Sequence, residues 1–252
     1  MLALKTDQKV ALVTGAGRNI GRAIALGLAY DGFAVVVNVR SSVAEGQAVV
    51  DELEAMGTPA MLCAADVTQQ PAVQAMMAQI TQQCGRLDVL VNNAAIRRDA
   101  PIADITLEAW RDTLAVVLDG AFFCAQAALP LLRQSPAGAV INIGGMTAHT
   151  GGLNRPHVVT AKAGLVGLTR ALAHDLAPGV TVNCVSPGMI STARNSTTTS
   201  GTPNHHAQHH PLLERRGTAD EVASMVCYLA SDKARFVTGQ VMHVNGGTYL
   251  GS

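Results

Sequence analysis

The sequence predicts an α/β fold, a doubly wound parallel β-sheet with helices on both faces. Two observations predict it. Residues 10–29 pass from an apolar run through a glycine-rich turn into an apolar pattern of helical period. After this segment, strand-like and helix-like stretches alternate along the chain, as is typical of parallel strands joined by right-handed helical crossovers. The length of 252 residues suits one such sheet, so we expect a single domain over residues 1–252.

The opening segment has the features of a dinucleotide-binding turn. Residues 10–13 are apolar throughout, as expected of a strand buried on both faces, and residues 20–28 carry apolar side chains at helical spacing. Between them Gly15, Gly17 and Gly21 allow a sharp turn and the close approach of a pyrophosphate, to which the helix N-terminus offers free N–H groups. An ordinary strand-to-helix turn also contains glycine, and we favour dinucleotide binding because of the motifs that follow.

The remaining elements follow in alternation. We predict strands at residues 33–39, 59–64, 87–91, 139–143, 180–185 and 241–244. We predict helices at residues 43–56, 71–83, 107–132, 158–176 and 219–229. Ligands of such sheets bind beyond the carboxyl ends of the strands, so we expect the site there.

Composition narrows the class of partner and the compartment. Eighteen basic residues balance eighteen acidic ones, which gives no field that would attract nucleic acid or an anionic membrane. We find neither a cationic leader with an apolar core nor an uninterrupted apolar run of about eighteen residues, and we expect a cytoplasmic protein. Five widely spread cysteines lack metal-ligand spacing and are expected to be reduced and mostly buried.

One stretch departs from the rest of the chain in composition. Residues 191–211 are rich in Ser, Thr and His, which indicates a long mobile loop, and we expect a substrate lid at about residues 189–212. This stretch contains an HHxxHH cluster, His205, His206, His209 and His210. On a helix its spacing would suit a metal pair, but no carboxylate or cysteine accompanies it. We therefore expect a polar, pH-sensitive lid and no metal.

Several short motifs stand directly after predicted strands: TGAGRNIG at residues 14–21, Asp66-Val67, NNAA at residues 92–95, and a Pro-Gly pair at residues 187–188 followed by Thr192. With these motifs in this order, residues 9–247 resemble the short-chain dehydrogenase/reductase family, and in particular its 3-oxoacyl-acyl-carrier-protein-reductase-like members. The resemblance implies a Rossmann-type fold and a nicotinamide-dependent oxidoreductase. Asn19 stands where the family usually has glycine, and asparagine tolerates positive φ, so we expect the turn to survive.

The resemblance also implies a cofactor site. The glycine-rich loop would hold the pyrophosphate, residues 66–67 the adenine, the NNAA motif the ribose and nicotinamide, and the segment from the Pro-Gly pair to Thr192 the carboxamide. The expected cofactor-binding residues are Thr14, Gly15, Gly17, Arg18, Asn19, Ile20, Gly21, Arg40, Ser41, Asp66, Val67, Asn92, Ala94, Lys162, Pro187, Gly188 and Thr192.

The end of the second strand indicates the choice between the two nicotinamide cofactors. An acidic residue there binds the 2′-hydroxyl of NAD and repels a phosphate. This strand ends in NVRS at residues 38–41, which contains no acid, and Arg18 supplies a second cation nearby. Because a guanidinium matches phosphate geometry, we favour NADP(H) over NAD(H) through Arg40 and Arg18. The alternative is that both arginines are simply solvated.

The catalytic positions depart from the family. Its members use a tyrosine that donates a proton, a lysine four residues later, a serine about thirteen residues earlier, and an asparagine further upstream. The lysine is Lys162, but the tyrosine position holds Val158, the serine position Gly145 and the asparagine position Val117. A positioned proton donor is typically worth about 10²–10⁴-fold in rate, so the ordinary carbonyl-reduction mechanism cannot be assumed.

Two histidines are candidates to replace the missing acid, and we name His157, His149 and Lys162 as candidate catalytic residues. His157 and Lys162 are five residues apart, about 140° around a helix. This angle argues against His157 as a replacement for the tyrosine, because its side chain would point away from Lys162. A π-bulge, or a helix that begins after His157, would remove this constraint. His149 follows a strand in a loop and has more freedom to turn inward. The alternative is that both histidines line a loop or cap a helix.

Arg97 and Arg98 follow the NNAA motif, where the family's chain skirts the substrate cleft. They are candidates to clamp a carboxylate or a phosphate, although a solvated basic pair is equally consistent with the sequence. Gly145, Met146 and Val158 complete the candidate substrate residues.

We therefore expect an NADP(H)-dependent oxidoreductase of the short-chain type that acts on a small molecule through an atypical proton-transfer site. Substrates that need no tyrosine acid, such as an iminium or an activated C=C bond, suit it. The alternatives are a non-catalytic, regulatory dinucleotide-binding protein and a non-redox lyase or isomerase that uses Lys162. Helices 107–132 and 158–176 are apolar around most of their surface, which agrees with the family's pairing of these helices in homo-dimers and homo-tetramers.

Overall fold

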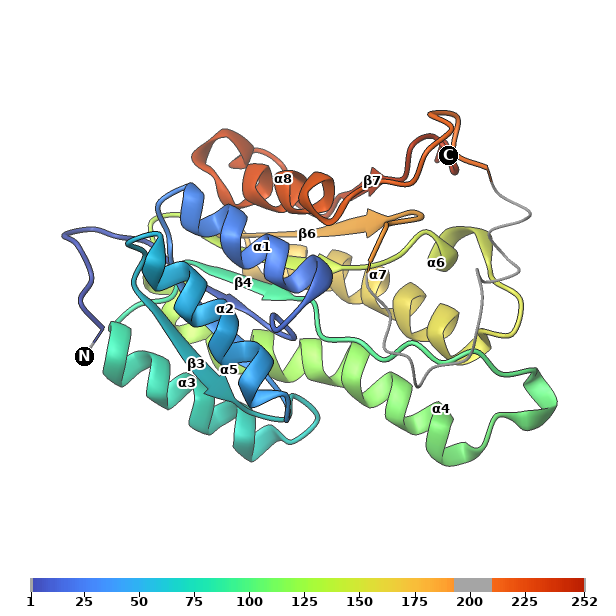
Figure 1. The fold of residues 1–252 in the computed structure, drawn as a ribbon, viewed down its shortest axis with the longest axis horizontal. Coiled ribbons are helices and arrows are strands. Elements are labelled where there is room, and N and C mark those ends of the chain that lie inside the picture. Colours follow the sequence, from blue (N-terminus) through green and yellow to red (C-terminus); the bar gives the residue numbers. More distant parts are fainter. Residues whose placement is uncertain (1, 193–209, 252) are drawn as a thin grey trace.

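The computed structural model describes residues 2–192 and 210–251 (Figure 1). Its strands are β1 (Val10–Val13), β2 (Ala34–Val39), β3 (Ala60–Ala64), β4 (Val89–Asn92), β5 (Gly138–Ile143), β6 (Val180–Pro187) and β7 (Val241–Val244). Its α-helices are α1 (Asn19–Tyr30), α2 (Val43–Ala55), α3 (Gln70–Cys84), α4 (Leu107–Leu114), α5 (Gly120–Gln134), α6 (Thr147–Thr150), α7 (Pro156–Leu176) and α8 (Ala219–Ala230).

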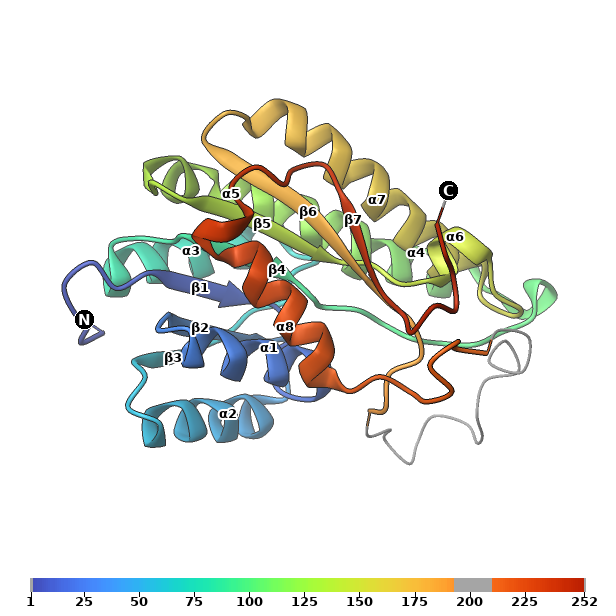
Figure 2. The same ribbon diagram turned by 90° about the horizontal axis from the view of Figure 1, so that it is seen from above.

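The described strands form one seven-stranded sheet in the order β3-β2-β1-β4-β5-β6-β7, and all neighbouring strands are parallel. Helices α1, α2 and α8 cover one face, and α3, α5 and α7 cover the other (Figures 1 and 2). Each face has its own apolar core, one including Ile24 and Val222 and the other including Ile80 and Leu132. The predicted single-domain, Rossmann-type, doubly wound sheet is confirmed.

The strand order reverses between β1 and β4. The chain runs outward from β1 to β2 and β3 on one side, and from β4 to β7 on the other. The loops after β1 and β4 therefore diverge at the carboxyl edge of the sheet and leave a crevice between them, the usual ligand position in this architecture. The helix α6 and the start of α7 lie at this same edge (Figure 2).

The predicted helix over residues 107–132 is interrupted. A π-helical turn, η2 (Ala115–Asp119), separates α4 from α5, and Val117 lies within it. The whole stretch Leu107–Gln134 is long and apolar enough to cross a membrane by length and composition alone, with a hydropathy of 1.8. Its packing against α3 and α7 accounts for this apolar character within the sheet-and-helix fold.

Other differences from the predicted elements are small. The helix expected from residue 158 begins at Pro156, and the strand expected to end at residue 185 continues to Pro187. The short helix α6 was not predicted. Residues 193–209 of the expected lid, including His205, His206 and His209, lie outside the described residues, whereas His210 is described and exposed.

Candidate active site

The loop between β1 and α1 has the conformation that its glycines predict. Gly15 has φ +62°, and Asn19 has φ +50°, which confirms that asparagine adopts the left-handed backbone expected at this position. A Cβ at Gly21 would meet the carbonyl oxygen of Gly15 and would lie 2.6 Å from Asn93 Nδ2. Only glycine fits there, so the loop and the first turn of α1 are held against the sheet.

Asn93 and Thr14 fix this loop to the loop after β4. Asn93 Nδ2 donates to the carbonyl oxygens of Thr14 and Gly15, at 2.9 and 3.0 Å. Thr14 Oγ1 accepts from the backbone N–H groups of Asn93 and Ala94, at 2.9 and 3.0 Å. These four bonds hold the glycine-rich loop, residues 14–21, in one conformation, and we call this loop the cradle. Asn93 was not among the expected site residues, and its only signal was its place in the NNAA motif.

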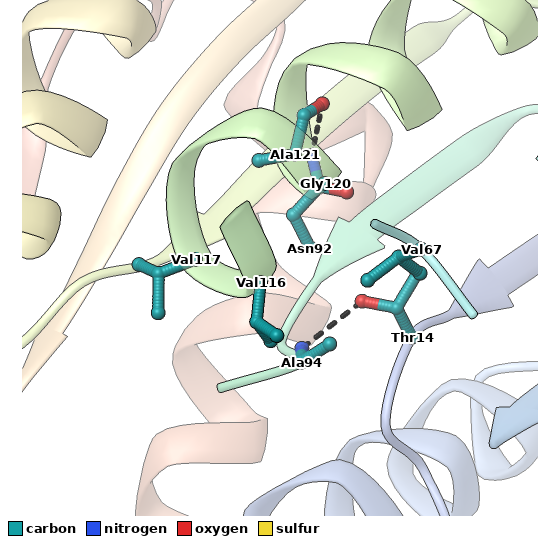
Figure 3. Close-up of a pocket in the computed structure, with 8 residues that line it drawn as sticks. All are labelled: Thr14, Val67, Asn92, Ala94, Val116, Val117, Gly120 and Ala121. Carbon is teal, nitrogen blue, oxygen red and sulfur yellow. Dashed lines mark hydrogen bonds between the residues drawn. The ribbon is translucent and has the colours of Figure 1, made fainter. Parts of the chain in front are cut away.

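A narrow crevice opens between the ends of β1 and β4 and the π-helical turn (Figure 3). It is lined by Thr14, Val67, Asn92, Ala94, Val116, Val117, Gly120 and Ala121. Four expected cofactor residues therefore line it together with Val117, which we predicted at the family's asparagine position. Asn92 Nδ2 donates to Asn142 Oδ1 at 2.9 Å, which anchors the end of β4 to β5.

One acid, Glu45, lies near the glycine-rich loop although β2 itself contains none. Arg40 is exposed, and Arg18 lies 3.9 Å from Glu45 in the first turn of α2. Both Arg18 and Glu45 line a hollow of about 280 Å³ beside the glycine-rich loop. Asn38 is buried and donates to the carbonyl oxygens of residues 63 and 65, so it braces β2 against the end of β3 and is not available to a ligand.

The expected carboxamide and adenine residues also lie at the carboxyl edge of the sheet. Gly188 packs closely on β7, since a Cβ there would be 2.7 Å from Asn245 Cα, and its N–H donates to Val244 O at 2.9 Å. Thr192 follows at the end of the described segment and is half-buried. Asp66 Oδ1 accepts two hydrogen bonds from Thr68, which fixes the turn after β3.

Lys162 is the one lysine or arginine that is buried among the described residues. It is 9% exposed, and its Nζ donates to the carbonyl oxygen of Ile143, at the end of β5, at 2.5 Å. Burial lowers the pKa of Lys162 to about 8, and the positive charge of Arg97 acts in the same direction. Its ammonium group is therefore charged at neutral pH but gives up its proton more readily than an exposed lysine.

Val117, Gly145 and Val158, where we predicted the family's asparagine, serine and tyrosine positions, carry no side-chain group that can donate a proton. Gly145 faces open space, since a Cβ added to it would meet nothing within 4 Å. Val158 is buried one helical turn before Lys162. Val117 is 2% exposed and packs with Ala161.

His157 lies in the first turn of α7 and is 1% exposed. Its Nδ1 is buried and has no hydrogen-bond partner among the described residues. Burial lowers the pKa of His157, the charge of Asp99 raises it, and the charges of two arginines lower it. The helix α7 begins at Pro156, so the possibility that the helix starts only after His157 is wrong. His157 and Lys162 therefore lie on different faces of the helix.

His149 belongs to a cluster of three rings. Its ring centroid lies 4.8 Å from that of His243 on β7 and 5.3 Å from that of Tyr249. Burial, and secondarily the charge of Arg170, lower the pKa of His149. In this position it joins α6 to β7 and the C-terminal segment, and its acid–base role stays a prediction.

Two arginines at the expected substrate cleft, Arg98 and Arg155, form ion pairs with aspartates. Arg155, at the start of α7, forms a two-point pair with Asp99 in the loop after β4, with N–O distances of 2.5 and 3.0 Å. The same loop is tied to α7 by a backbone bond from Ala100 N to Asn154 O. Arg98 lies 3.6 Å from Asp112. Sequence reasoning found Arg97 and Arg98 but missed Arg155, because only the fold brings the start of α7 to this loop.

Comparison with known proteins identifies the family. A family profile described as Enoyl-(Acyl carrier protein) reductase matches residues 15–249. The 3-oxoacyl-(acyl-carrier-protein) reductase FabG of Staphylococcus aureus is 40% identical over 243 residues, 96% of this chain and 98% of the relative. The FabG protein of Escherichia coli strain K12 is 37% identical over 245 residues, 97% of this chain and 98% of the relative. A short-chain dehydrogenase/reductase from Brucella melitensis, titled a glucose/ribitol dehydrogenase, superimposes with a TM-score of 0.88 at 30% identity and covers 96% of this chain and 97% of that one.

The chain belongs to the short-chain dehydrogenase/reductase family. It is thus by family an NAD(P)-dependent oxidoreductase, and the resemblance to 3-oxoacyl-acyl-carrier-protein reductases is confirmed. Its described residues combine a glycine-rich loop that is held against the sheet with a buried lysine, Lys162, and with Val117, Gly145 and Val158 at the other predicted catalytic positions.

Proposed function

We propose that this short-chain dehydrogenase/reductase is an NADP(H)-dependent reductase of a small molecule whose reduction requires no tyrosine acid. One observation carries the proposal. The cradle after β1 is braced by Asn93 and Thr14, while Val117, Gly145 and Val158 supply no hydroxyl or amide beside Lys162.

The residues of the cradle suit a dinucleotide. The close approach that Gly15 and Gly21 permit leaves room for a pyrophosphate at the start of α1. Arg18, which lines the hollow beside the glycine-rich loop, and the exposed Arg40 at the end of β2 are the cations that would bind a 2′-phosphate, and we therefore favour NADP(H) over NAD(H). The bound cofactor would supply a hydride, and Lys162 would hold its ribose hydroxyls.

The substrate follows from what the site lacks. The family profile carries the name of an enoyl reductase and the relatives that of 3-oxoacyl reductases. A ketone that takes up a hydride becomes an alkoxide and needs a proton at oxygen, which the missing tyrosine would give. A C=C bond activated by a neighbouring carbonyl or carboxyl group takes its proton at carbon instead, so we favour reduction of such a bond.

A second function is supported by Lys162 itself. With a pKa of about 8, this amine would act as a base near neutral pH in a non-redox elimination or isomerisation. The third alternative is a regulatory protein that binds the dinucleotide without turnover.

The assembly and compartment are further parts of the proposal. Phe122 on α5 is 42% exposed, and on the opposite side of the sheet Tyr228 of α8 and Phe236 are 41% and 104% exposed. Large apolar side chains at two surfaces favour contact with further copies of the chain, as a dimer or tetramer. We propose a cytoplasmic homo-oligomer without a nucleic-acid or membrane partner.

The test is a screen of activated alkenes and simple ketones with NADPH, followed by the absorbance of the reduced nicotinamide. The proposal expects turnover with at least one alkene. Product formation without any change in that absorbance would establish the non-redox function. Tight NADPH binding without turnover of any compound would favour the regulatory one.

A further inference from the structure

Three aromatic rings join α6 to the C-terminal segment, residues 245–251, which runs beside α6 in Figure 2. The ring centroid of His149 on α6 lies 4.8 Å from that of His243 on β7 and 5.3 Å from that of Tyr249. The centroids of His243 and Tyr249 are 5.0 Å apart. The two histidine rings meet edge to face, and His149 and Tyr249 are stacked. Each ring therefore packs against the other two, and we call these three side chains the ring cluster.

Hydrogen bonds of Asn245 connect the ring cluster to the predicted cofactor site. Asn245 Nδ2 donates to the carbonyl oxygen of Tyr249 at 2.8 Å, and Asn245 Oδ1 accepts from Gly247 N at 2.9 Å. On its other side Asn245 packs on Gly188, where a Cβ would lie 2.7 Å from Asn245 Cα. The ring cluster and these bonds thus hold the C-terminal segment against both α6 and Gly188.

The ring cluster is built for neutral histidines. His149 Nε2 and His243 Nδ1 are both buried and have no hydrogen-bond partner among the described residues. A protonated imidazole has two N–H donors, so protonation of either ring in this packing would leave a charged donor unpaired. A buried charge without a partner costs more free energy than a buried neutral group, so the packed cluster disfavours the proton.

No acid from the surrounding elements offsets such a charge. The sequences of α6, β6, β7 and residues 245–251 contain no aspartate or glutamate. From α7, the positive charge of Arg170 acts on His149, and the acid of that helix, Asp175, follows five residues later, about 140° around the helix. Burial is the main cause that lowers the pKa of both histidines, and the charges of Arg170 on His149 and of His149 on His243 act in the same direction.

We propose that His149, His243 and Tyr249 form a pH-sensitive latch, which holds residues 245–251 against α6 at neutral pH and releases them in acid. A histidine uncovered by the release has the ordinary pKa of 6.5, which is higher than in the packed cluster. Below about pH 6.5 the released state therefore binds more protons, and the latch loses stability as the pH falls. The latch itself needs no cofactor, and only its effect on the cofactor site through Gly188 rests on the proposed function.

The test measures hydrogen exchange of the full-length, cofactor-free protein by mass spectrometry at about pH 7.5 and about pH 5, on either side of the ordinary pKa of histidine. The intrinsic pH dependence of exchange is divided out. We expect exchange in residues 245–251 to rise at least about tenfold at the lower pH, because release lets the histidines take up protons. Residues 89–92, in the buried strand β4, are the internal reference and should not change.

Two variants and a matched control assign the effect to the ring cluster. The double variant His149→Phe/His243→Phe keeps two aromatic rings that cannot be charged, so the rise in exchange should disappear. Tyr249→Ala removes the third ring, so residues 245–251 should exchange at least about tenfold faster than in wild type already at the higher pH. His174→Gln, at an exposed histidine of α7, is the control and should keep the rise seen in wild type.

Equal corrected exchange at the two pH values in wild type would overturn the latch. So would a rise that persists in the folded double variant, or an equal rise in residues 89–92, which would show unfolding of the whole sheet. Should the double variant fail to fold, Tyr249→Ala decides, and wild-type exchange in that variant at the higher pH would overturn the proposal. Because no cofactor is present, none of these results depends on NADP(H) binding, which titration with NADPH judges separately.

Discussion

The predicted cofactor region and the predicted proton-transfer region of this protein are built in opposite ways. In the first, formed by the ends of β1 and β4 and the start of α1, Asn93 and Thr14 make four hydrogen bonds across the two loops. In the second, formed by β5, α6 and the start of α7, Gly145 faces open space and Val158 is apolar. The first region is braced by these hydrogen bonds, and the second has no hydroxyl group at the two positions where we predict the family's serine and tyrosine.

On the proposed function, the difference means that hydride delivery and proton delivery are separable in this fold. The glycine-rich loop depends on backbone geometry, close packing and the hydrogen bonds of Asn93 and Thr14. The proton chemistry depends on a few hydroxyl and amide groups, which single substitutions remove while the sheet stays intact. Lys162 donates to the end of β5 in the second region, and we predict that it also binds the cofactor, so its properties test both regions.

The strongest test of this difference in packing is to add one methyl group to each region. In Gly21→Ala the new Cβ meets the carbonyl oxygen of Gly15, whereas in Gly145→Ala it meets nothing within 4 Å. We expect Gly21→Ala to lose at least about 100-fold in NADPH affinity, about 2.8 kcal/mol, and Gly145→Ala to lose none. Calorimetric titration measures both, with circular dichroism as a check of folding. Similar affinities in the two variants would show that the cradle is not as rigid as its packing indicates.

The burial of Lys162 should make stability depend on pH. Its pKa falls from 10.5 to about 8 on folding, so between these values the unfolded chain binds more protons and stability rises with pH. Burial of the charged Lys162 ammonium group lowers the free energy of unfolding by about 3 kcal/mol below pH 8. This loss of stability disappears as the pH approaches 10.5. Without cofactor, the free energy of unfolding of Lys162→Met should exceed that of the wild type by about 3 kcal/mol at pH 7. Near pH 10 the two proteins should be almost equally stable. Urea unfolding at both pH values measures it, and a difference that does not change with pH contradicts the assignment.

Lys162→Met also tests whether this residue belongs to the cofactor region. If its ammonium group binds the ribose hydroxyls, the variant should lose about 1.5–3 kcal/mol of NADPH affinity, the value of a charged hydrogen bond. If Lys162 is a base for non-redox chemistry, affinity should stay nearly constant while turnover ceases. The dissociation constant for NADPH in the two proteins separates these cases, and Arg133→Met serves as a charge control.

The smallest expected effect concerns the 2′-phosphate. We expect NADPH to bind about tenfold more tightly than NADH, about 1.4 kcal/mol. Arg40→Ala should reduce this preference, whereas Glu45→Gln should increase it because an acid that pairs with Arg18 is removed. Titration of both cofactors into each variant decides the point. Equal affinities in wild type, or a preference unaffected by Arg40→Ala, would refute the assignment of NADP(H).

Much of the fold was predictable because its signals are local. Continuous apolar runs and helical periods placed the strands and helices, and the left-handed backbone of Asn19 followed from the tolerance of asparagine for positive φ. The π-helical turn at Val117 was not predictable, because residues 107–134 keep a helical apolar pattern throughout and one inserted residue per turn leaves little trace in it.

Only the residues of the site that belong to short sequence motifs were predictable. The glycines, Lys162 and the vacant positions could be counted from the sequence. The pairing of Arg155 with Asp99 joins segments 56 residues apart, and no spacing rule predicts it. Glu45 escaped notice because it lies on α2 and approaches Arg18 only through the packing of that helix beside the glycine-rich loop.

The most direct test of the central claim is one titration followed by one assay on the same sample. NADPH is added to the wild-type protein until its fluorescence shows saturation, and a simple ketone is then supplied while the absorbance of the reduced nicotinamide is recorded. The account predicts saturable binding and no oxidation above the background rate. Failure to bind NADPH, or steady ketone reduction at rates usual for the family, would contradict it.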